Sequence, residues 1–528
     1  MKKRSAIILL PLALALLALA VLVTACGGGV AATQQETKQA GAADSKAAEA
    51  ATTQAAGSGA QSAGAGADVP TLIWFMGSPG NIPPDQAKVE EKLNEISVEA
   101  IGAKVKTVFM SGDEVMLALS AGETWDKAFT CEWYNNYAIQ ALAGYFYDIT
   151  DKLPEVTPKL WADMPQVVWD GAKINGRIMA VPVKKDYAAE LYWQFDRDLF
   201  KSLDMDIPGE MSFAGVEPYL EAAKKAWADK NPNVKVEYPM TLNRGGVGGI
   251  LSDFDMISRD ALIGIPYGAI GTPDESKVVL ALRDPEIIDR LNAVHRWYRA
   301  GYINPDAMTT DTAATLYAIR SGQGFYGADA IWSAGSGFPN AISKFSGPFL
   351  STASIRGAMN AINARSQHPD LVLKLMELIN TNQEYRDILR YGIEGEHWNK
   401  TPEGLAKRTQ AGIDGYTVWA FSQGSYSLST VEAAVGVEVD PKMWEKIFDS
   451  YKDAVATKSI GFAFDPIKIE VELAAVSAAN KKYWEGLATG TLDPATALPQ
   501  MIGEFESAGI DKIIAECQRQ YDEFLAGK

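Results

Sequence analysis

The sequence predicts an α/β protein with a helix-rich C-terminal third. Apolar strand patterns and amphipathic helix patterns alternate from Thr71 to Ala143, and this order favours a parallel sheet with helices on both faces. From Asp465 onward the pattern is almost wholly helical, with Ala, Leu and Val repeating on one face. The globular part begins near Pro70 and contains about 460 residues, which is enough for two or three structural units.

The chain begins with the layout of an export signal. Three basic residues at positions 2–4 precede an apolar run from Ala6 to Val23, which is the usual order in a cleavable signal peptide. A run of this length can also span a bilayer, so a transmembrane anchor is the alternative. The segment Val23-Thr24-Ala25-Cys26 resembles a lipobox, in which the cysteine is acylated and the bond before it is cut. We therefore expect a lipoprotein with a signal peptide over residues 1–25 and a lipid on Cys26.

Residues 26–69 have the composition of a flexible tether. They are mainly Ala, Gly, Ser, Thr and Gln and include no aromatic residue, so they cannot bury a core. Cleavage before Cys26 removes three of the 49 basic residues, which leaves 46 against 66 acidic ones and a net charge of −20. Such a charge repels nucleic acid and anionic lipid. We expect no nucleic-acid partner, and we expect the lipid itself to hold the protein at the membrane.

Strands and helices alternate in the first globular segment. The predicted strands there are continuous apolar runs, as in a sheet buried on both faces, and the first helix places Val89, Leu93 and Ile96 on one side. In chain order, the strands are 71–76, 105–110 and 127–130, the helices between and after them are 84–100, 113–119 and 136–143, and later strands are expected at 178–183, 189–195, 262–266 and 324–332.

Later helices are expected to begin at Asp-Pro pairs. In each pair the carboxylate can cap the helix, and proline is suited to the first helical position. The pairs are Asp284-Pro285, Asp440-Pro441, Asp465-Pro466 and Asp493-Pro494.

The sequence lacks the motifs of common catalytic and metal sites. Its three histidines lie far apart, and it has no HExxH, P-loop, G-x-S-x-G or EF-hand pattern, so we expect no metal and no cofactor. Cys131 and Cys517 are interpreted as small buried residues, with a disulfide between them as the alternative. Glycoside hydrolysis needs only two carboxylates, so a surface-anchored glycosidase is an alternative function.

Turn and cap motifs follow one another in a specific order over some 400 residues. In this order they resemble the family 1 extracellular solute-binding proteins of ABC importers, the maltose-binding-protein-like sugar binders. Two later stretches, Tyr391 to Trp398 and Phe464 to Gln518, narrow the resemblance to a LipO-like branch with a helical C-terminal domain of unassigned function. The earlier motifs are Trp169-Asp170-Gly171, Ile174-Asn175-Gly176-Arg177, Ala180-Val181-Pro182, Asp196-Arg197-Asp198-Leu199-Phe200 and Gly301-Tyr302-Ile303-Asn304-Pro305-Asp306.

The resemblance implies a two-lobed periplasmic-binding-protein-like fold of type II, with a hinge between the lobes. It places lobe 1 at residues 70–185 plus 325–390, and lobe 2, with the C-terminal helical region, at 190–320 plus 391–528. The chain crossings would then fall near 183–191, 321–327 and 391–395.

The resemblance also implies the role of a binding protein rather than an enzyme. The expected protein is a monomer anchored by its lipid to the extracellular face of the cell membrane. It would capture a carbohydrate, most plausibly an oligosaccharide, by closure of the lobes and deliver it to the permease subunits of an ABC importer. A binder of peptides or of other small solutes on the same fold is a further alternative.

Candidate ligand residues lie where predicted strands end, since open α/β sheets bind their ligands at that edge. Sugars present hydroxyls around the ring and C–H bonds on its faces, so their sites combine aromatic rings with acidic side chains. The loop Glu132-Trp133-Tyr134 after the third strand offers both, although capping and packing explain it equally well. The other candidates, each with a packing or capping alternative, are Met76 and Gly77 after the first strand, Asp113 after the second, Asp186 and Tyr187 after the first crossing, Tyr267 at a later strand end, Asp329 and Trp332 after the second crossing, and Glu394 near the third.

Overall fold

The computed structural model describes residues 69–78, 81–312, 314–434 and 436–528. The predicted signal peptide, the lipid attachment at Cys26 and all but the last residue of the predicted tether lie outside the described residues. Within the described ranges, no helix is both long enough and apolar enough to cross a membrane.

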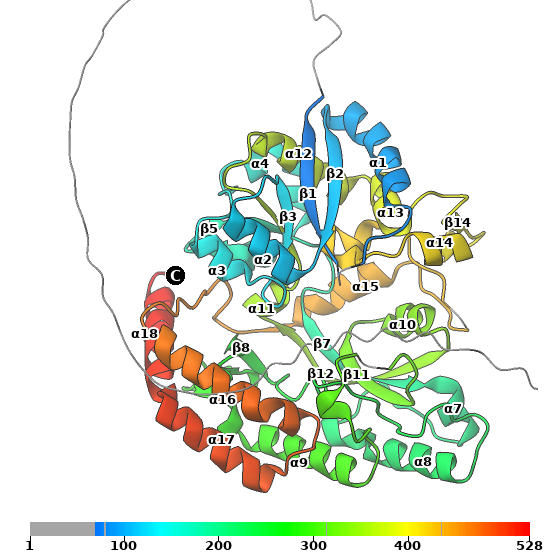
Figure 1. The fold of residues 1–528 in the computed structure, drawn as a ribbon, viewed down its shortest axis with the longest axis vertical. Coiled ribbons are helices and arrows are strands. Elements are labelled where there is room, and N and C mark those ends of the chain that lie inside the picture. Colours follow the sequence, from blue (N-terminus) through cyan, green and yellow to red (C-terminus); the bar gives the residue numbers. More distant parts are fainter. Residues whose placement is uncertain (1–68, 79–80, 313, 435) are drawn as a thin grey trace, which may run out of the picture. The chain divides into compact units, whose positions relative to one another are not determined.

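The first lobe is built on a five-stranded sheet with the order β2-β1-β3-β13-β6. β1 runs parallel to β2 and β3, as the alternation of strands and helices predicts, and β13 lies antiparallel between β3 and β6. Figure 1 shows this sheet in the upper half of the view, with helices around it. The strands are β1 (Thr71–Gly77), β2 (Lys104–Met110), β3 (Lys127–Thr130), β6 (Ala180–Pro182) and β13 (Met359–Ile362).

The helices of this lobe follow from apolar periodicity and capping. In α1, Val89 and Leu93 are buried one turn apart, and Gly102 ends the helix in the left-handed conformation. At α2, Ser111 and Glu114 form a reciprocal capping box. The helices are α1 (Gln86–Ile101), α2 (Gly112–Ala121), α3 (Tyr137–Leu142), α4 (Leu153–Val156), α5 (Pro158–Asp163), α6 (Gln166–Ala172), α11 (Thr352–Ile355), α12 (Pro369–Thr381), α13 (Gln383–Tyr391), α14 (Gln410–Gly415) and α15 (Met443–Ser450), and the short hairpins are β4 (Lys173–Ile174) with β5 (Arg177–Ile178) and β14 (Trp398–Lys400) with β15 (Ala406–Arg408).

The second lobe has a four-stranded sheet of order β11-β7-β12-β16 and a three-stranded sheet of order β10-β9-β8. Along β7, Trp193 and Phe195 face the lobe's core, and Glu190 and Tyr192 alternate with them on the opposite side. The strands are β7 (Ala189–Asp196), β8 (Phe254–Ser258), β9 (Ile263–Pro266), β10 (Val279–Leu280), β11 (Ile319–Gly324), β12 (Asn340–Leu350) and β16 (Val455–Ala456), and the helices before the C-terminal region are α7 (Arg197–Ser202), α8 (Glu217–Ala228), α9 (Pro285–Arg299) and α10 (Ala328–Ser336).

Short 3₁₀ turns complete the described elements. They are η1 (Phe213–Val216), η2 (Tyr267–Ala269), η3 (Ala281–Arg283), η4 (Ala307–Thr309), η5 (Ala420–Ser422), η6 (Tyr426–Leu428) and η7 (Tyr451–Asp453).

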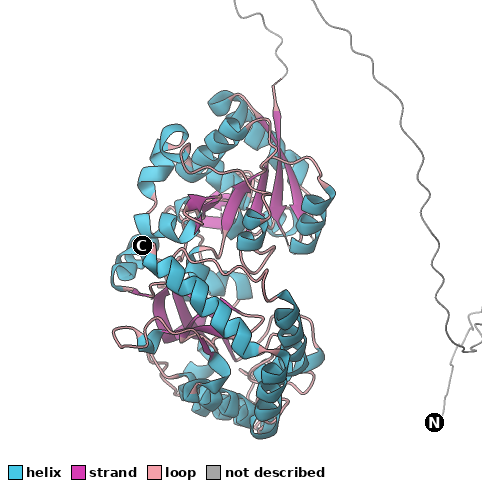
Figure 2. Ribbon diagram, turned by 90° about the vertical axis from the view of Figure 1, so that its left-hand side faces the viewer, coloured by secondary structure: helices cyan, strands magenta, loops and turns pink. Residues whose placement is uncertain are grey.

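Two separate hydrophobic cores confirm the predicted two-lobed α/β architecture. The first core surrounds the five-stranded sheet and includes Trp74, and the second includes Trp193 and Trp297. Figure 2 shows the strands of the two lobes as two groups, each with its own helices. Cys131 and Cys517 are free and buried in different clusters, as expected for small packing residues.

The C-terminal helices belong to the second lobe. Cys517 and Tyr521 of the last helix are buried in the second core, and the first of these helices packs against the second and against α9. The helices are α16 (Glu470–Ala488), α17 (Pro494–Ala508) and α18 (Ile510–Ala526), drawn from orange to red in Figure 1.

The division of the chain between the lobes differs from the prediction in two places. β12 pairs with β7 in the sheet of lobe 2, so residues 340–350 lie in lobe 2 rather than in lobe 1, and the crossing expected near 321–327 lies near residue 351.

The second difference follows residue 390. Tyr416 and Trp444 are buried in the first core, so residues 391–454 pack mainly on lobe 1, and the expected crossing at 391–395 is wrong. The crossing lies near 455–461, because β16 already pairs with β12 of lobe 2, whereas Ile460 still packs in the first core and Phe462 packs in the second. The physical reason is that buried polar side chains of α13 hold this segment to lobe 1.

The predicted strand at 324–332 is also wrong. β11 ends at Gly324, and Gly327, with a φ of 77°, precedes α10. The apolar run that follows is buried on one side of a helix, and a short apolar run does not distinguish strand from helix.

The Asp-Pro pairs initiate helices in two of the four predicted places. Asp284 and Asp493 accept hydrogen bonds at the first turns of α9 and α17. Asp440 and Asp465 accept the same kind of bond from the residue two positions on, but α15 and α16 begin only at residues 443 and 470. The local turn therefore follows from the sequence, whereas its continuation into a helix depends on packing.

The late crossing is tied to the second lobe by one buried carboxylate. Asp255 on β8 accepts hydrogen bonds from the hydroxyls of Thr457 and Ser459, and all three side chains are buried. On the other side, the hydroxyl of Thr352 donates to the carbonyl oxygen of Ser459 at 2.8 Å. The crossing is thus held to both lobes at once.

Replacement of Asp255 by Ala is expected to destabilise the protein. The change removes the shared acceptor of two buried hydroxyls, which keep only their bond to each other at 2.7 Å, so the free energy of unfolding should fall by about 1–3 kcal/mol. Urea denaturation measures this difference, with the exposed Asp260→Ala as the control. Equal stability of the two variants would contradict the assigned role of Asp255.

Candidate functional site

The end of β3 projects one aromatic side chain outward. The side chain of Asn135 accepts hydrogen bonds from Thr130 Oγ1 at 2.7 Å and from the backbone N–H of Cys131 at 3.4 Å, which folds the intervening loop back on itself. Trp133, at the tip of this loop, is 56% exposed. Its indole Nε1 donates to the carbonyl oxygen of Gly357 at 2.9 Å, so the ring is exposed yet fixed.

Trp133 is part of a cluster of five aromatic rings, which we call the aromatic platform. The indoles of Trp133 and Trp419 lie 5.8 Å apart, and Phe421 stacks on Trp419 at 5.4 Å. The buried ring of Phe129 supports them from β3, with its centroid 4.9 Å from that of Tyr134. The platform consists of Phe129, Trp133, Tyr134, Trp419 and Phe421.

The platform can bind the apolar face of a ring-shaped ligand. An exposed indole held against other rings offers a flat, polarisable surface at little entropic cost. The hydroxyl of Tyr134 donates to the carbonyl oxygen of Met110, and burial raises the pKa of Tyr134. The phenol therefore stays neutral and fixed at ordinary pH.

A half-buried carboxylate lies next to the platform. Glu132 Oε1 is 3.3 Å from Arg356 Nη1, and Arg356 is itself buried and donates to the carbonyl oxygens of Gly171 and Lys173 at 2.8 and 2.7 Å. The Glu132 side chain keeps 32% of its surface exposed. It can therefore accept a hydrogen bond from a ligand hydroxyl while Arg356 holds it in place.

Gly77 permits the close approach of β1 to the platform. A Cβ at this position would lie 2.5 Å from the Phe129 ring, so a larger residue would displace the ring. The carbonyl oxygen of Gly77 lies 3.5 Å from the hydroxyl of Ser422. Of the predicted residues, the structure thus brings together Gly77, Glu132, Trp133 and Tyr134.

Asp186 and Tyr187 lie in the first crossing, where they make structural contacts. The Asp186 carboxylate accepts from Lys185 Nζ at 2.8 Å and from Gln323 Nε2 at 2.9 Å, which links the first crossing to β11. The ring of Tyr187 stacks on Phe448 at 5.7 Å. Both predicted residues are buried, so they hold the crossings together in this conformation.

Asp329 and Trp332 lie on α10 against the four-stranded sheet. The indole of Trp332 packs edge-on against Tyr192 at 6.4 Å, and a Cβ at Gly324 would lie 2.6 Å from that indole. Burial raises the pKa of Asp329. These two predicted residues form a group separate from the platform.

The remaining four predicted residues are scattered. Met76 is buried in the first core, and Tyr267 is buried in a face-to-face stack on Phe349 at 3.9 Å. Asp113 is exposed in the first turn of α2, and Glu394 is exposed in the turn before β14. The structure therefore does not gather them with the platform.

Trp419 and Phe421 are functional candidates that the sequence did not reveal. They lie in a segment without strand or helix periodicity, more than 280 residues after Trp133. The density of aromatic residues between 416 and 426 was the available signal. That density alone does not place the segment next to Trp133 in space.

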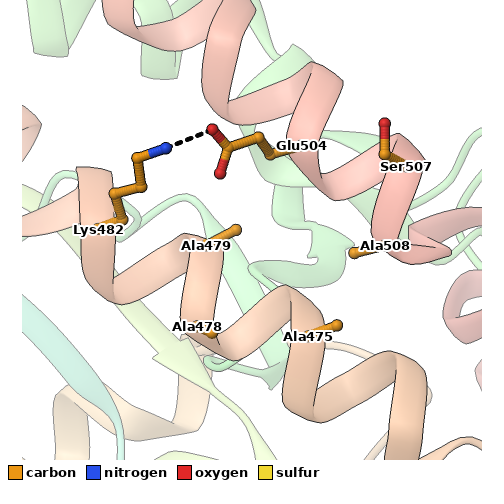
Figure 3. Close-up of a pocket in the computed structure, with 7 residues that line it drawn as sticks. All are labelled: Ala475, Ala478, Ala479, Lys482, Glu504, Ser507 and Ala508. Carbon is orange, nitrogen blue, oxygen red and sulfur yellow. Dashed lines mark hydrogen bonds and ion pairs between the residues drawn. The ribbon is translucent and has the colours of Figure 1, made fainter. Parts of the chain in front are cut away.

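Two hollows lie away from the platform. One, of about 420 Å³, lies between α16 and α17, where four alanines and the ion pair of Lys482 with Glu504 line it (Figure 3). The other, of about 270 Å³, lies near Trp444 and is lined by residues such as Gln383, Thr430 and Lys442. In the described part of the chain, no three His, Cys, Asp or Glu side chains gather to hold a metal ion.

Comparison with known proteins reveals related chains. Residues 458–526, which include the last three helices, match the family described as "Domain of unknown function (DUF3502)". A "Carbohydrate ABC transporter substrate-binding protein" of Streptococcus pneumoniae serotype 4 (strain ATCC BAA-334 / TIGR4) is 26% identical over 461 residues, or 85% of this chain and 90% of that protein.

Solved structures share the fold over most of the chain. The N-glycan transport solute binding protein (NgtS) from Streptococcus pneumoniae superposes with a TM-score of 0.76 at 24% identity, covering 87% of this chain and 99% of that one. Its complex with Man5GlcNAc gives a TM-score of 0.72 at the same identity and coverage. These similarities confirm the predicted fold class and the predicted family resemblance.

Replacement of Gly77 by Ala is expected to disturb the platform. The new Cβ meets the Phe129 ring at 2.5 Å, and overpacking of this kind lowers the free energy of unfolding by about 1–3 kcal/mol. Chemical denaturation measures the loss. The control is Gly335→Ala on α10, where a Cβ meets nothing within 4 Å, and a Gly77→Ala protein as stable as this control would contradict the close packing.

Proposed function

We propose that this chain is an extracellular solute-binding protein of an ABC transporter, which captures an oligosaccharide on the aromatic platform and delivers it to a membrane permease. The observation that carries the proposal is the exposed but fixed indole of Trp133, joined by the ring of Trp419. Sugar rings expose C–H bonds on their faces, so aromatic rings and a nearby carboxylate such as Glu132 suit them together.

The relatives support a carbohydrate ligand. One relative is named as a carbohydrate ABC transporter substrate-binding protein, and a solved structure of the same fold is a complex with Man5GlcNAc. An oligosaccharide is long enough to extend from the platform toward lobe 2. The candidates Asp329 and Trp332 on α10 are therefore proposed as further contacts.

The proposed mechanism is capture by hinge closure. Each lobe has its own core, so a ligand bound to lobe 1 gains further contacts only when lobe 2 approaches, and these contacts stabilise the closed state. Closure also changes the surface that the permease meets. The role is binding without turnover, and the protein acts as a monomer.

The proposed location is the extracellular face of the cell membrane, through a lipid on Cys26. The signal-like segment before Cys26 and the low-complexity segment after it support this location. A tether of this kind raises the local concentration of the binding protein at its permease.

Replacement of Trp133 by Ala is expected to weaken binding of Man5GlcNAc about tenfold, because one aromatic stacking contact contributes about 1 kcal/mol or more. Isothermal titration calorimetry measures the affinity. The matched control is Trp227→Ala, since Trp227 is also exposed but lies on α8 of lobe 2. Unchanged affinity in the Trp133 variant would refute the platform as the site, and release of free sugar during the titration would favour a glycosidase.

Replacement of Cys26 by Ser is expected to abolish lipid attachment, because serine offers no thiol for acylation. In cells fed radiolabelled palmitate, the unaltered protein should be labelled and sediment with membranes. The variant should carry no label. Equal labelling of the two proteins would rule out Cys26 as the lipid site.

A further inference from the structure

One side of α13 carries three buried charged side chains that the proposed binding role does not use. Arg386, Asp387 and Arg390 are each at most 7% exposed. Burial of charged groups costs free energy unless their hydrogen bonds are satisfied. All three groups direct their hydrogen bonds mainly to a single loop, residues 420–430.

Arg386 binds this loop through all three guanidinium nitrogens. Nε donates to the carbonyl oxygen of Ser425 at 2.9 Å, and Nη2 donates to that of Ala420 at 2.6 Å. Nη1 donates to Gln423 Oε1 at 2.8 Å. Burial lowers the pKa of Arg386 to about 10. Because the acceptors are carbonyl groups, the contacts fix the backbone path rather than form an ion pair.

Arg390 and Asp387 hold the end of the same loop. Arg390 donates to the Ser429 hydroxyl at 2.9 Å and to the Tyr426 hydroxyl at 3.0 Å, and its guanidinium lies 4.3 Å from the centre of the Tyr426 ring. The Asp387 carboxylate accepts from the backbone N–H and the hydroxyl of Thr430 at 2.7 and 2.6 Å. The eleven residues of the loop are therefore fixed at both ends.

Trp419 and Phe421 lie at the start of this loop. The loop has only two short 3₁₀ turns of its own, so few of its backbone groups form the hydrogen bonds of regular secondary structure. Its close approach to α12 is specific, since a Cβ at Gly424 would lie 2.2 Å from Ile379 Cγ2. The position of both platform rings therefore depends on contacts that α12 and α13 supply from beneath.

We propose that Arg386, Asp387 and Arg390 are positioning residues for ligand binding, because they fix the loop that places Trp419 and Phe421 against Trp133. They touch no ligand themselves. This role rests on the proposed function. It predicts that loss of the contacts of Arg386, Asp387 and Arg390 weakens binding through Trp419 and Phe421.

The test is a double-mutant cycle with Man5GlcNAc as the probe. Arg386→Lys keeps the positive charge, but the single ammonium group of lysine cannot donate to three acceptors in the planar geometry of the guanidinium. By calorimetry, this variant should bind about tenfold more weakly than the unaltered protein. In a Trp419→Ala background the same change should have a clearly smaller effect, because one of the two rings that Arg386 positions is absent.

Arg290→Lys is the matched control. Arg290 on α9 is equally buried and donates to the carbonyl oxygens of Gly249 and Ile250 at 3.0 and 3.2 Å, but it lies in lobe 2. This variant should lose stability without weakening binding. Hydrogen exchange should show faster exchange over residues 419–430 only in the Arg386 variant.

Each result decides the proposal. Unchanged affinity in Arg386→Lys, or losses that simply add with those of Trp419→Ala, would overturn it. If the Arg386 variant does not fold, Thr430→Val, which removes the hydroxyl bonded to Asp387, takes its place in the same cycle.

If Trp133→Ala and Trp419→Ala leave binding intact, the proposed site fails. If they weaken binding and the Arg386 and Thr430 variants do not, only the positioning role fails.

Discussion

The chain is divided between two hydrophobic cores, and this division decides which candidate ligand groups lie together. The first core surrounds the five-stranded sheet and the second contains Trp193 and Trp297. Because packed cores deform little, a change in the angle between the lobes would be confined to the crossings. The platform lies wholly on lobe 1, so lobe 2 covers a ligand there only by hinge motion.

Beneath the platform, lobe 1 buries cations without carboxylate partners. Lys127 on β3 donates to Asn360 Oδ1 at 2.6 Å, and its ammonium lies 3.3 Å from the centre of the Trp74 ring. The same ammonium lies 3.5 Å from the carbonyl oxygen of Gln423. Burial lowers the pKa values of Lys127 and Arg386. Buried charges of this kind add little stability, and here they join β3, β13 and the platform loop in one arrangement.

The sequence predicted the early elements of lobe 1 closely because their signals are local. β3 occupies the expected residues 127–130, and α1 and α2 lie within two residues of their expected bounds. The local patterns did not predict the secondary structure where long-range packing determines it. The apolar residues of α10 suited a strand equally well, and Asp440 and Asp465 form the expected turns without starting helices there.

By itself, the sequence determined the alternation of strands and helices, the helical C-terminal region and the loop that carries Trp133, since periodicity and capping act over a few residues. Only the tertiary structure decided which lobe holds residues 391–454, and with it the partners of Trp133. Trp419 and Phe421 reach that indole through long-range bonds of Arg386 and a close approach at Gly424. Such contacts join residues far apart in the chain, and no local sequence pattern predicts them.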